Sequence, residues 1–238
     1  MARLPALIAR YAECDGRPRK TIGWYARVAR EAGKLPTTKR GSGAAHMGVS
    51  EVVNLLLACN VAEEAKDGPR IIEQLRSLRT RPFASEAGLE SYALSAVVSQ
   101  PDLGSALDEL VCRSPEIFDD FKAIVKRENP NAGENFWRSA ARRSIGIDVT
   151  LWRYGAEIEY WRSRKAIRES EVCMKYLQDD HRMFNGFYTP EPSQDRTVRV
   201  TLSFRTFLRL AELVLDGAGK SAGEIDKSTL VNNGGGDG

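Results

Sequence analysis

The sequence is poor in the residues that most often build metal sites. Its 238 residues include only two histidines, and the four cysteines stand far apart with no C-x-x-C pair. We therefore expect no zinc site, and such scattered cysteines are typical of a reducing cytoplasm. Asp179-Asp180-His181 has metal-ligand chemistry, but a polar surface turn explains it better. No metal and no cofactor are expected.

Long apolar runs and nucleotide-binding motifs are also missing. No stretch approaches the roughly 18 apolar residues of a membrane span, and residues 1–10 lose their apolar character too early for a signal peptide. Gly41-Ser42-Gly43 is no phosphate loop, because no strand precedes it and no Gly-Lys-Thr/Ser follows it. No spacing suggests a Ser/His/Asp or Cys/His pair. We expect neither enzymatic activity nor a membrane partner.

The positive charge of the chain is concentrated near its start. The net charge is +3 at pH 7, but residues 1–48 contain ten basic and three acidic side chains, so this part carries +7 and the remainder −4. The hydrophobic content of 42% and the charged content of 28% are typical of a soluble globular protein. A basic module on a mildly acidic body predicts contact with a polyanion; a solvated basic surface is the alternative.

Residues 21–57 predict a helix, a basic glycine loop and a second helix. The apolar residues of the first helix recur at three- and four-residue spacing, which places them on one face. They are Ile22, Tyr25, Val28, Ala29 and Ala32. Gly33 and Pro36 end this helix. Residues 37–43 are polar and basic, and Ser50 is the predicted N-cap of the next, Leu-rich helix.

A shorter helix is predicted before this stretch. Leu4, Leu7 and Tyr11 share one helical face, and Asp15-Gly16 marks the end of the helix. The turn that follows, residues 14–20, is predicted to be longer than usual. Because the turn is also unusually basic, we expect it to contact phosphates. The two helices and the turn together predict a helix-turn-helix.

The candidate DNA-binding residues lie on the turn, on the second helix and on the glycine loop. They are Arg17, Arg19, Lys20, Thr21, Trp24, Arg27, Arg30, Lys39, Arg40, Ser42 and His46. A helix fits the major groove of B-DNA, where Arg or Lys reads guanine and Thr touches a thymine methyl group. Cations flanked by glycine suit a phosphate or a narrow minor groove. The alternatives are an ordinary surface helix, a surface loop and, for the histidine, a packing role.

The order of helix, basic glycine loop and helix resembles the winged helix-turn-helix of the MerR family. In that family, a recognition helix with the pattern T-x-x-x-Y-x-R runs into G-L-L-P and then into a basic wing. The matching residues are Thr21, Tyr25 and Arg27, then Gly33-Lys34-Leu35-Pro36, then Lys39-Arg40-Gly41-Ser42-Gly43. Ala44-Ala45-His46-Met47 stands where the family has a Tyr-Arg-Tyr strand.

A second pattern is similar to regulators of alphaproteobacterial prophages and gene transfer agents. Their N-terminal modules carry R-E-A-G-x-x-P and R-G-x-G-A-A-H-M, which match residues 30–36 and 40–47. This resemblance implies an activator of prophage-like or gene transfer agent genes. It also implies double-stranded promoter DNA as the ligand, a co-activator that contacts RNA polymerase, and a DNA-bending protein.

The whole chain predicts an α+β, mostly helical protein. Later helices are predicted at about residues 50–65, 71–78, 89–98, 103–111, 115–125 and 207–215. Strands are predicted at residues 145–151, 156–160 and 197–204. Helical spacing dominates the front and alternation dominates the back, so a small antiparallel sheet follows the helices. Residues 163–177 are ambiguous and partly helical in pattern, and residues 185–194 read as a loop.

Four segments follow from these patterns. Residues 1–82 are predicted to form a winged helix-turn-helix-like DNA-binding domain, and residues 83–130 a helical connection. Residues 131–217 are predicted to form a small α+β domain for dimerisation or partner binding, and residues 218–238 a disordered tail. The linker signal is Asn-Pro-Asn-Ala-Gly at residues 129–133.

An aromatic cluster in the C-terminal half has two readings. Trp152, Tyr154, Tyr160 and Trp161 precede Arg162, Arg164 and Lys165. Such a cluster can stack single-stranded bases. A sheet that packs its aromatic side chains on helices is the commoner explanation.

The main hypothesis is a cytoplasmic, nucleoid-associated, sequence-specific transcription regulator whose body forms a homodimer or engages another protein. The second hypothesis is a DNA-packaging or recombination accessory protein, such as a small terminase subunit or an excisionase. A third is a protein-interaction adaptor with an incidental basic face. The oligomeric state distinguishes the first two hypotheses, because a large ring favours DNA packaging.

Overall fold

The computed structural model describes residues 2–37, 45–81, 90–164, 167–177, 183–184, 187–188 and 199–225. The fold is α+β and mostly helical, as the sequence predicts, with a small antiparallel sheet and a C-terminal helix. The helices are α1 (Leu4–Asp15), α2 (Arg19–Glu31), α3 (Val49–Val61), η1 (Ala65–Asp67), α4 (Gly68–Arg76), α5 (Tyr92–Val98), α6 (Leu103–Glu128), α7 (Glu134–Ser144) and α8 (Phe204–Ile225). The strands are β1 (Ala2–Arg3), β2 (His46–Met47), β3 (Arg79–Arg81), β4 (Ile145–Trp152), β5 (Gly155–Arg164), β6 (Ile167–Leu177), β7 (Met183–Phe184), β8 (Phe187–Tyr188) and β9 (Val200–Ser203).

Five strands form an antiparallel sheet in the order β3-β6-β5-β4-β9. Side chains alternate along its central strands. Ile147, Val149 and Ile158 are buried, whereas Asp148 and Glu159 lie on the more exposed face. β3 pairs with β6, so the segment predicted as the N-terminal domain contributes a strand to this sheet.

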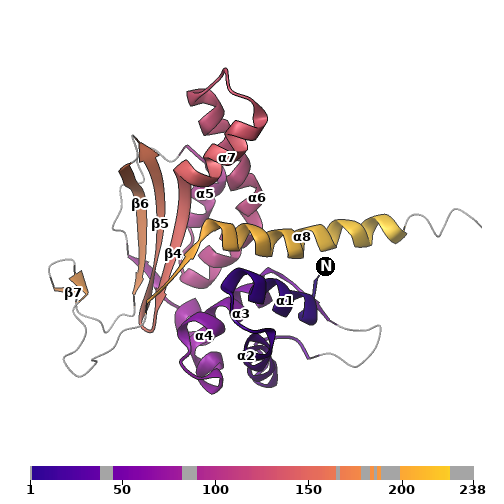
Figure 1. Cartoon of the computed structure of the whole chain (residues 1–238). Helices are drawn as coiled ribbons and strands as arrows, with labels where there is room; N and C mark the ends of the chain where they lie inside the picture. Colours follow the sequence, from indigo (N-terminus) through magenta and orange to yellow (C-terminus); the bar gives the residue numbers. More distant parts are fainter. Residues whose placement is uncertain are drawn as a thin grey trace, which may run out of the picture.

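The helices are grouped on one side of the sheet. In Figure 1 the sheet stands at the left, α5, α6 and α7 lie beside it, and α1 to α4 lie below them. α8 leaves β9 and runs across the molecule between these two groups of helices. The arrangement buries the apolar face of the sheet and leaves the charged face towards solvent.

α8 closes the hydrophobic core. Phe207, Leu210 and Ala211 on this helix have no exposed surface, and α8 packs against both α6 and α1. The buried apolar side chains form one cluster that extends from Leu7 to Val214. This cluster takes side chains from each of the first three predicted segments, whose boundaries at residues 82, 130 and 217 stay predictions.

Several boundaries in the first half differ from the prediction. α3 begins one residue before Ser50, because the backbone N–H of Gly48 donates to Glu51 Oε2 (2.7 Å) and Gly48 is the N-cap. The helix ends at Val61 instead of near residue 65. Gly68-Pro69, which falls between two predicted helices, opens α4, since proline suits the first turn of a helix.

Residues 103–128 form one helix rather than two. Asp102 caps α6, with its Oδ1 accepting from the backbone N–H of Ser105 (2.8 Å). Pro115 lies inside α6 instead of starting a new helix. It is exposed, and Ser114 Oγ donates to the carbonyl of Leu110 (2.6 Å) in the same turn. α7, which follows the loop at residues 129–133, has no counterpart in the prediction.

The second half holds two further corrections. The partly helical reading of residues 163–177 is wrong, because residues 167–177 form β6. α8 continues through Asp216-Gly217 to Ile225, beyond the predicted start of the disordered tail. Residues 226–238, the predicted wing at Lys39-Arg40-Gly41-Ser42-Gly43, Asp179-Asp180-His181 and most of the loop predicted at residues 185–194 lie outside the described residues.

Candidate nucleic-acid interface

The turn between α1 and α2 is shorter than predicted. It consists of Gly16, Arg17 and Pro18, three residues, which is the usual length in a helix-turn-helix. Gly16 adopts a left-handed conformation (φ 79°), and its N–H donates to the carbonyl of Ala12 (2.9 Å) to end α1. The carbonyl of Pro18 accepts from the N–H of Thr21 (2.9 Å), which starts α2. Arg19 and Lys20, predicted in the turn, belong to α2.

A glycine ends α2 where the sequence predicts. Gly33 has φ 72°, a conformation that costs glycine little and other residues more. The N–H of Lys34 donates to the carbonyl of Ala29 (2.8 Å), and the N–H of Gly33 donates to that of Arg30 (3.0 Å). This pair of bonds is a Schellman motif, which stops the helix abruptly.

The inner face of α2 holds the helix in place. Ile22, Ala26 and Ala29 are fully buried, and the helix packs against α1, α3 and α4. Tyr25 Oη donates to the carbonyl of Ala62 (3.1 Å), just beyond the end of α3. The orientation of α2, and therefore of its outer face, is set by these contacts.

The side chain of Arg17 holds α1 and α3 together and does not belong to the exposed face of α2. Its Nη1 donates to the carbonyl of Cys59 (2.7 Å) near the end of α3, and its Nε pairs with Asp15. Only a third of its side chain is exposed. The predicted phosphate contact by Arg17 would require these bonds to break, so we leave this residue out of the interface.

The outer face of α2 carries a basic and aromatic stripe. Lys20, Trp24 and Arg27 are exposed at positions i, i+4 and i+7, so they lie on one side of the helix. Trp24 is 56% exposed, and the Arg27 guanidinium lies 5.6 Å from the centre of its ring. Arg19 and Thr21 are also exposed, beside this stripe in the first turn. An exposed indole next to cations offers both an aromatic surface and positive charge to a ligand.

Acidic side chains partly neutralise the positive charge of this stripe. Glu31 follows on the same stripe and accepts from Arg27 Nε (2.7 Å), with both side chains more than half exposed. Glu13 lies 3.8 Å from Arg10 and from Arg19. Within the described part of the chain, no carboxylate pairs with Lys20, which makes it the cation most available to a phosphate.

The remaining residues predicted to contact DNA differ in exposure, and some of them lie outside the described part of the chain. Arg30 is only partly exposed, and His46 is exposed on β2, opposite Arg3 of β1. Lys39, Arg40 and Ser42 lie outside the described residues, so the structure does not place them relative to α2.

Burial raises the pKa values of ionisable groups beneath the exposed face of α2. It raises the pKa of the Cys59 thiol to about 12 and the pKa of Tyr11 well above its usual value. Tyr11 Oη accepts a hydrogen bond from Asn60 Nδ2 between α1 and α3. These groups are uncharged at neutral pH, so the charge of the module lies on its outer side.

The aromatic cluster in the sheet is used for packing. Tyr160 is buried, with its ring stacked 5.8 Å from that of Phe121. The Trp161 ring lies so close over Gly146 that a Cβ there would meet it at 2.5 Å, and Arg168 covers the ring at 4.7 Å. Gly146 and Arg168 thus both contact this indole, as expected for an aromatic side chain that packs on its own sheet.

Comparisons with known proteins give no match for this chain among protein-family models, curated proteins or solved structures. Within the described ranges, no three His, Cys, Asp or Glu side chains are arranged to hold a metal ion. No helix of the described part has the length and hydropathy needed to cross a membrane.

Proposed function

We propose that the protein is a sequence-specific DNA-binding transcription regulator that reads its site with α2. One observation carries this proposal: a helix-turn-helix frame holds α2 by its apolar face and leaves Lys20, Trp24 and Arg27 in one exposed stripe. This is the arrangement in which a recognition helix enters the major groove.

The first turn of α2 suits the phosphate backbone. Its free backbone N–H groups and the helix dipole favour an anion, and Arg19 and Lys20 add two full charges there. The pair between Arg19 and Glu13 is long, at 3.8 Å, and both side chains are more than half exposed. Exposed pairs of this kind contribute little, so Arg19 can exchange Glu13 for a phosphate at small cost.

The middle of α2 suits base reading. Arg27 lies two turns from the start of the helix, and an Arg there can bond the O6 and N7 atoms of guanine. Trp24 supplies an apolar surface beside it that fits a thymine methyl group or a sugar. Lys39, Arg40 and Ser42 are proposed as backbone contacts on the basis of the sequence alone.

The biological setting of this proposal comes from the resemblance. It is control of prophage-like or gene transfer agent promoters, together with a co-activator that contacts RNA polymerase and a DNA-bending protein. A homodimer would bind two half-sites and gain effective concentration.

Selection from a random double-stranded DNA library tests the proposal. The full-length protein is expected to enrich one motif, and its affinity for that motif should fall by orders of magnitude between about 50 and 200 mM salt. Lys20→Gln should weaken binding to the motif and to a scrambled duplex about equally. Lys66→Gln is the matched control, because this lysine is also exposed but lies on η1 beside Glu64.

Three results would contradict the proposal. These are a library without enrichment, a dissociation constant that does not change with salt, and a Lys66→Gln variant as weak as Lys20→Gln. Enrichment by a large ring-shaped assembly would instead indicate DNA packaging.

A further inference from the structure

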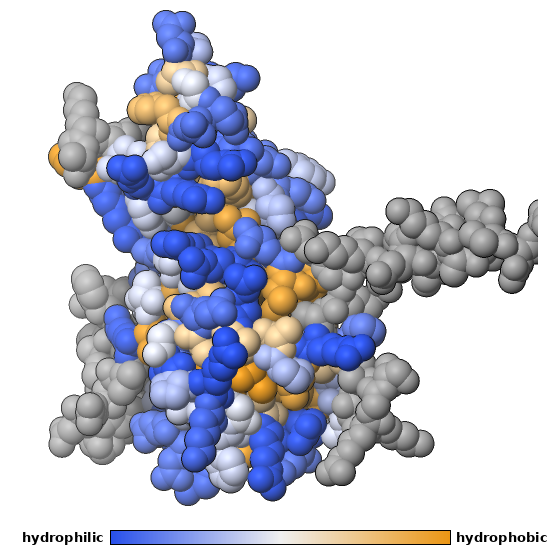
Figure 2. All heavy atoms as spheres, turned by 45° about the vertical axis from the view of Figure 1, so that its right-hand side comes forward, coloured by the Kyte–Doolittle hydropathy of each residue, from blue (hydrophilic) through white to orange (hydrophobic). Residues whose placement is uncertain are grey.

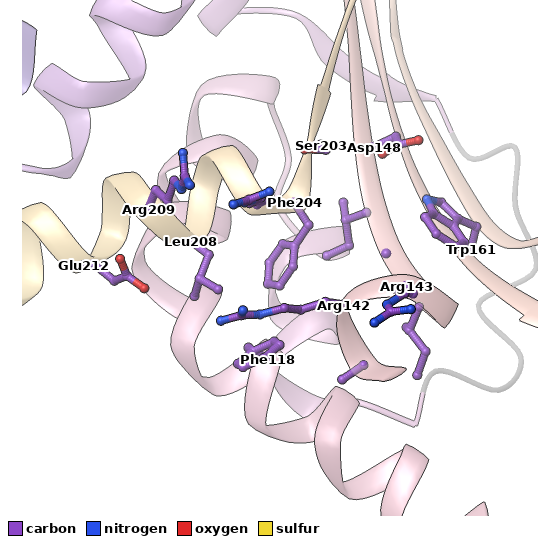
Figure 3. A pocket seen from close by; sticks show the side chains of 15 residues that line it. Phe118, Arg142, Arg143, Asp148, Trp161, Ser203, Phe204, Leu208, Arg209 and Glu212 are labelled. Carbon is purple, nitrogen blue, oxygen red and sulfur yellow. The ribbon is translucent and has the colours of Figure 1, made fainter. Parts of the chain in front are cut away.

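A pocket of about 590 Å³ lies far along the chain from the α2 stripe. Its walls come from α6, the last turn of α7, β4, β5 and the beginning of α8. Figure 3 shows these side chains converging from helices on one side and strands on the other. Volumes of roughly 300–1,000 Å³ are typical of small-molecule sites.

The floor of the pocket is apolar and held in place. Phe204 is buried, and its ring lies 5.4 Å from that of Phe121 in the core. Phe118 and Leu208 are partly exposed and face the same space. Figure 2 shows that apolar side chains reach the surface along the middle of one face of the molecule, bordered by hydrophilic ones. Such a floor favours a ligand with a ring or a chain.

Four guanidinium groups surround this floor. Arg142 and Arg143 end α7, and Arg205 and Arg209 begin α8. Among the described residues, no carboxylate lies within 4 Å of any of the four. Arg113 and Arg162, by contrast, each have carboxylates within that distance.

Three of the four arginines have neutral contacts instead, and one of these is Arg209, which lies beside the thiol of Cys14 on α1. The Arg142 guanidinium lies 5.5 Å from the centre of the Phe118 ring, and in the view of Figure 3 its side chain extends between Phe118 and Phe204. Arg143 Nη2 donates to Ser139 Oγ (2.7 Å). Most of their donors therefore remain available to an anion.

Two acidic residues also line the pocket, but they do not cancel this charge. Asp148 is paired with Arg168 at 2.8 Å, which leaves Glu212 against four arginines. Like charges gathered around one cavity repel each other, and an anion bound among them would relieve that repulsion. Guanidinium groups bond carboxylate, sulfonate and phosphate oxygens in pairs, which adds direction to the attraction.

We propose that this pocket binds a small organic anion that combines an apolar ring or chain with a carboxylate, sulfonate or phosphate group. The apolar part lies on Phe118, Phe204 and Leu208, and the acidic group faces the arginines of α7 and α8. The pocket is separate from the α2 stripe, so this inference does not depend on DNA binding.

Two fluorescent probes of similar shape test the proposal. One is 8-anilinonaphthalene-1-sulfonate, which carries the acidic group, and the other is N-phenyl-1-naphthylamine, which is uncharged. The full-length protein should bind the sulfonate at one site, and should bind it more tightly than the amine. Phenyl phosphate should displace the sulfonate at concentrations at which phenol does not.

Substitutions of the pocket arginines show whether the probe binds in this pocket. Arg142→Gln/Arg205→Gln should raise the dissociation constant of the sulfonate about tenfold or more and leave the amine unchanged. Arg142→Lys/Arg205→Lys should retain most of the affinity, because the charges remain. Arg70→Gln/Arg153→Gln, two exposed arginines outside the pocket, is the control with the same change of charge. Single glutamine variants serve if the double variant does not fold.

Three outcomes would overturn the proposal. One is sulfonate binding that is unchanged in the glutamine variants. Another is equal affinity for the charged and uncharged probes. The third is a glutamine double variant that loses affinity for DNA but not for the sulfonate, which would assign these arginines to a nucleic-acid surface.

Discussion

Arg17 provides the sharpest test of how the turn between α1 and α2 is built, because the sequence and the structure assign this residue different roles. From the sequence, Arg17 is a phosphate contact in a basic turn. In the structure it bonds the carbonyl of Cys59 at 2.7 Å and the carboxylate of Asp15. We therefore predict that Arg17→Met lowers stability and leaves DNA affinity almost unchanged.

The magnitude follows from the bonds that are lost. A hydrogen bond from a charged donor contributes about 1.5–3 kcal/mol when buried, and the side chain of Arg17 is 33% exposed. We take about 1–2 kcal/mol as the expected loss in the free energy of unfolding. For a chain of this length, each kcal/mol lowers the melting temperature by about 2–4 °C, so the expected shift is about 2–8 °C.

Lys20→Met is the matched comparison, because Lys20 is exposed and has no carboxylate partner in the described part of the chain. Its melting temperature should stay within about 1 °C of the wild type. Its affinity for DNA should fall, and the slope of log Kobs against log salt should become shallower by about 0.9. Thermal unfolding and a salt-dependent binding titration of the two variants give both quantities. If Arg17→Met melts like the wild type but binds DNA as weakly as Lys20→Met, the structural role of Arg17 is refuted.

Further predictions concern Glu31, Gly33 and two of the cysteines. Glu31→Gln should tighten DNA binding about two- to fivefold at low salt, because the substitution frees Arg27 and removes a negative charge from the stripe. A binding titration measures this change. Unchanged or weaker binding would show that Arg27 does not face DNA. Gly33→Ala should lower the free energy of unfolding by about 1 kcal/mol in urea denaturation. The cause is the backbone conformation of φ 72°, because an added Cβ would meet no neighbour. No loss of stability would mean that the end of α2 rearranges. Burial raises the pKa of Cys59 from about 9 to about 12, so the unfolded chain holds fewer protons between these values and stability should fall as pH rises through this window. Exposed Cys112 should react with a thiol reagent at pH 8 well before Cys59, and equal rates would contradict the buried position of Cys59.

The elements predicted best are those whose signals are local. The ends of α1 and α2 coincide with Gly16 and Gly33, both at positive φ, where glycine is the residue least penalised. The hairpin of β4 and β5 alternates apolar and polar residues from Ile147 to Leu151 and from Ala156 to Tyr160, so both strands were predictable there. Asp102 as an N-cap is equally local, because the bond it accepts comes from Ser105, three residues away.

The elements predicted worst depend on distant partners. The first four residues of β6 are all exposed and include Arg168 and Glu169, so only pairing with β5 keeps them extended. Pro115 was read as a helix start because a proline normally interrupts the ladder, but α6 continues through it with the ring exposed to solvent. These outcomes are decided by tertiary context, which a short window of sequence does not contain.

The functional residues divide in the same way. The exposed stripe of α2 follows from helical spacing, and the structure bears out the exposure of Lys20, Trp24 and Arg27. The role of Arg17 depends on a carbonyl 42 residues away, which spacing alone does not reveal. The arginine pocket was not foreseen at all, because its walls are assembled from residues between Phe118 and Glu212. Arg142-Arg143 at a helix end was its only local signal.

The packing of α8 on α1 has a consequence for the order of events during synthesis. These two helices are separated by nearly the whole described chain, and closing a loop of about 200 residues costs about 5 kcal/mol in chain entropy. A ribosome that adds about 5–20 residues per second completes α2 roughly 10–40 s before α8 emerges. During that interval α1 lacks the neighbour that covers it, and α2 rests on an incomplete frame. Nascent and truncated chains are therefore expected to compete poorly for DNA sites with the finished protein.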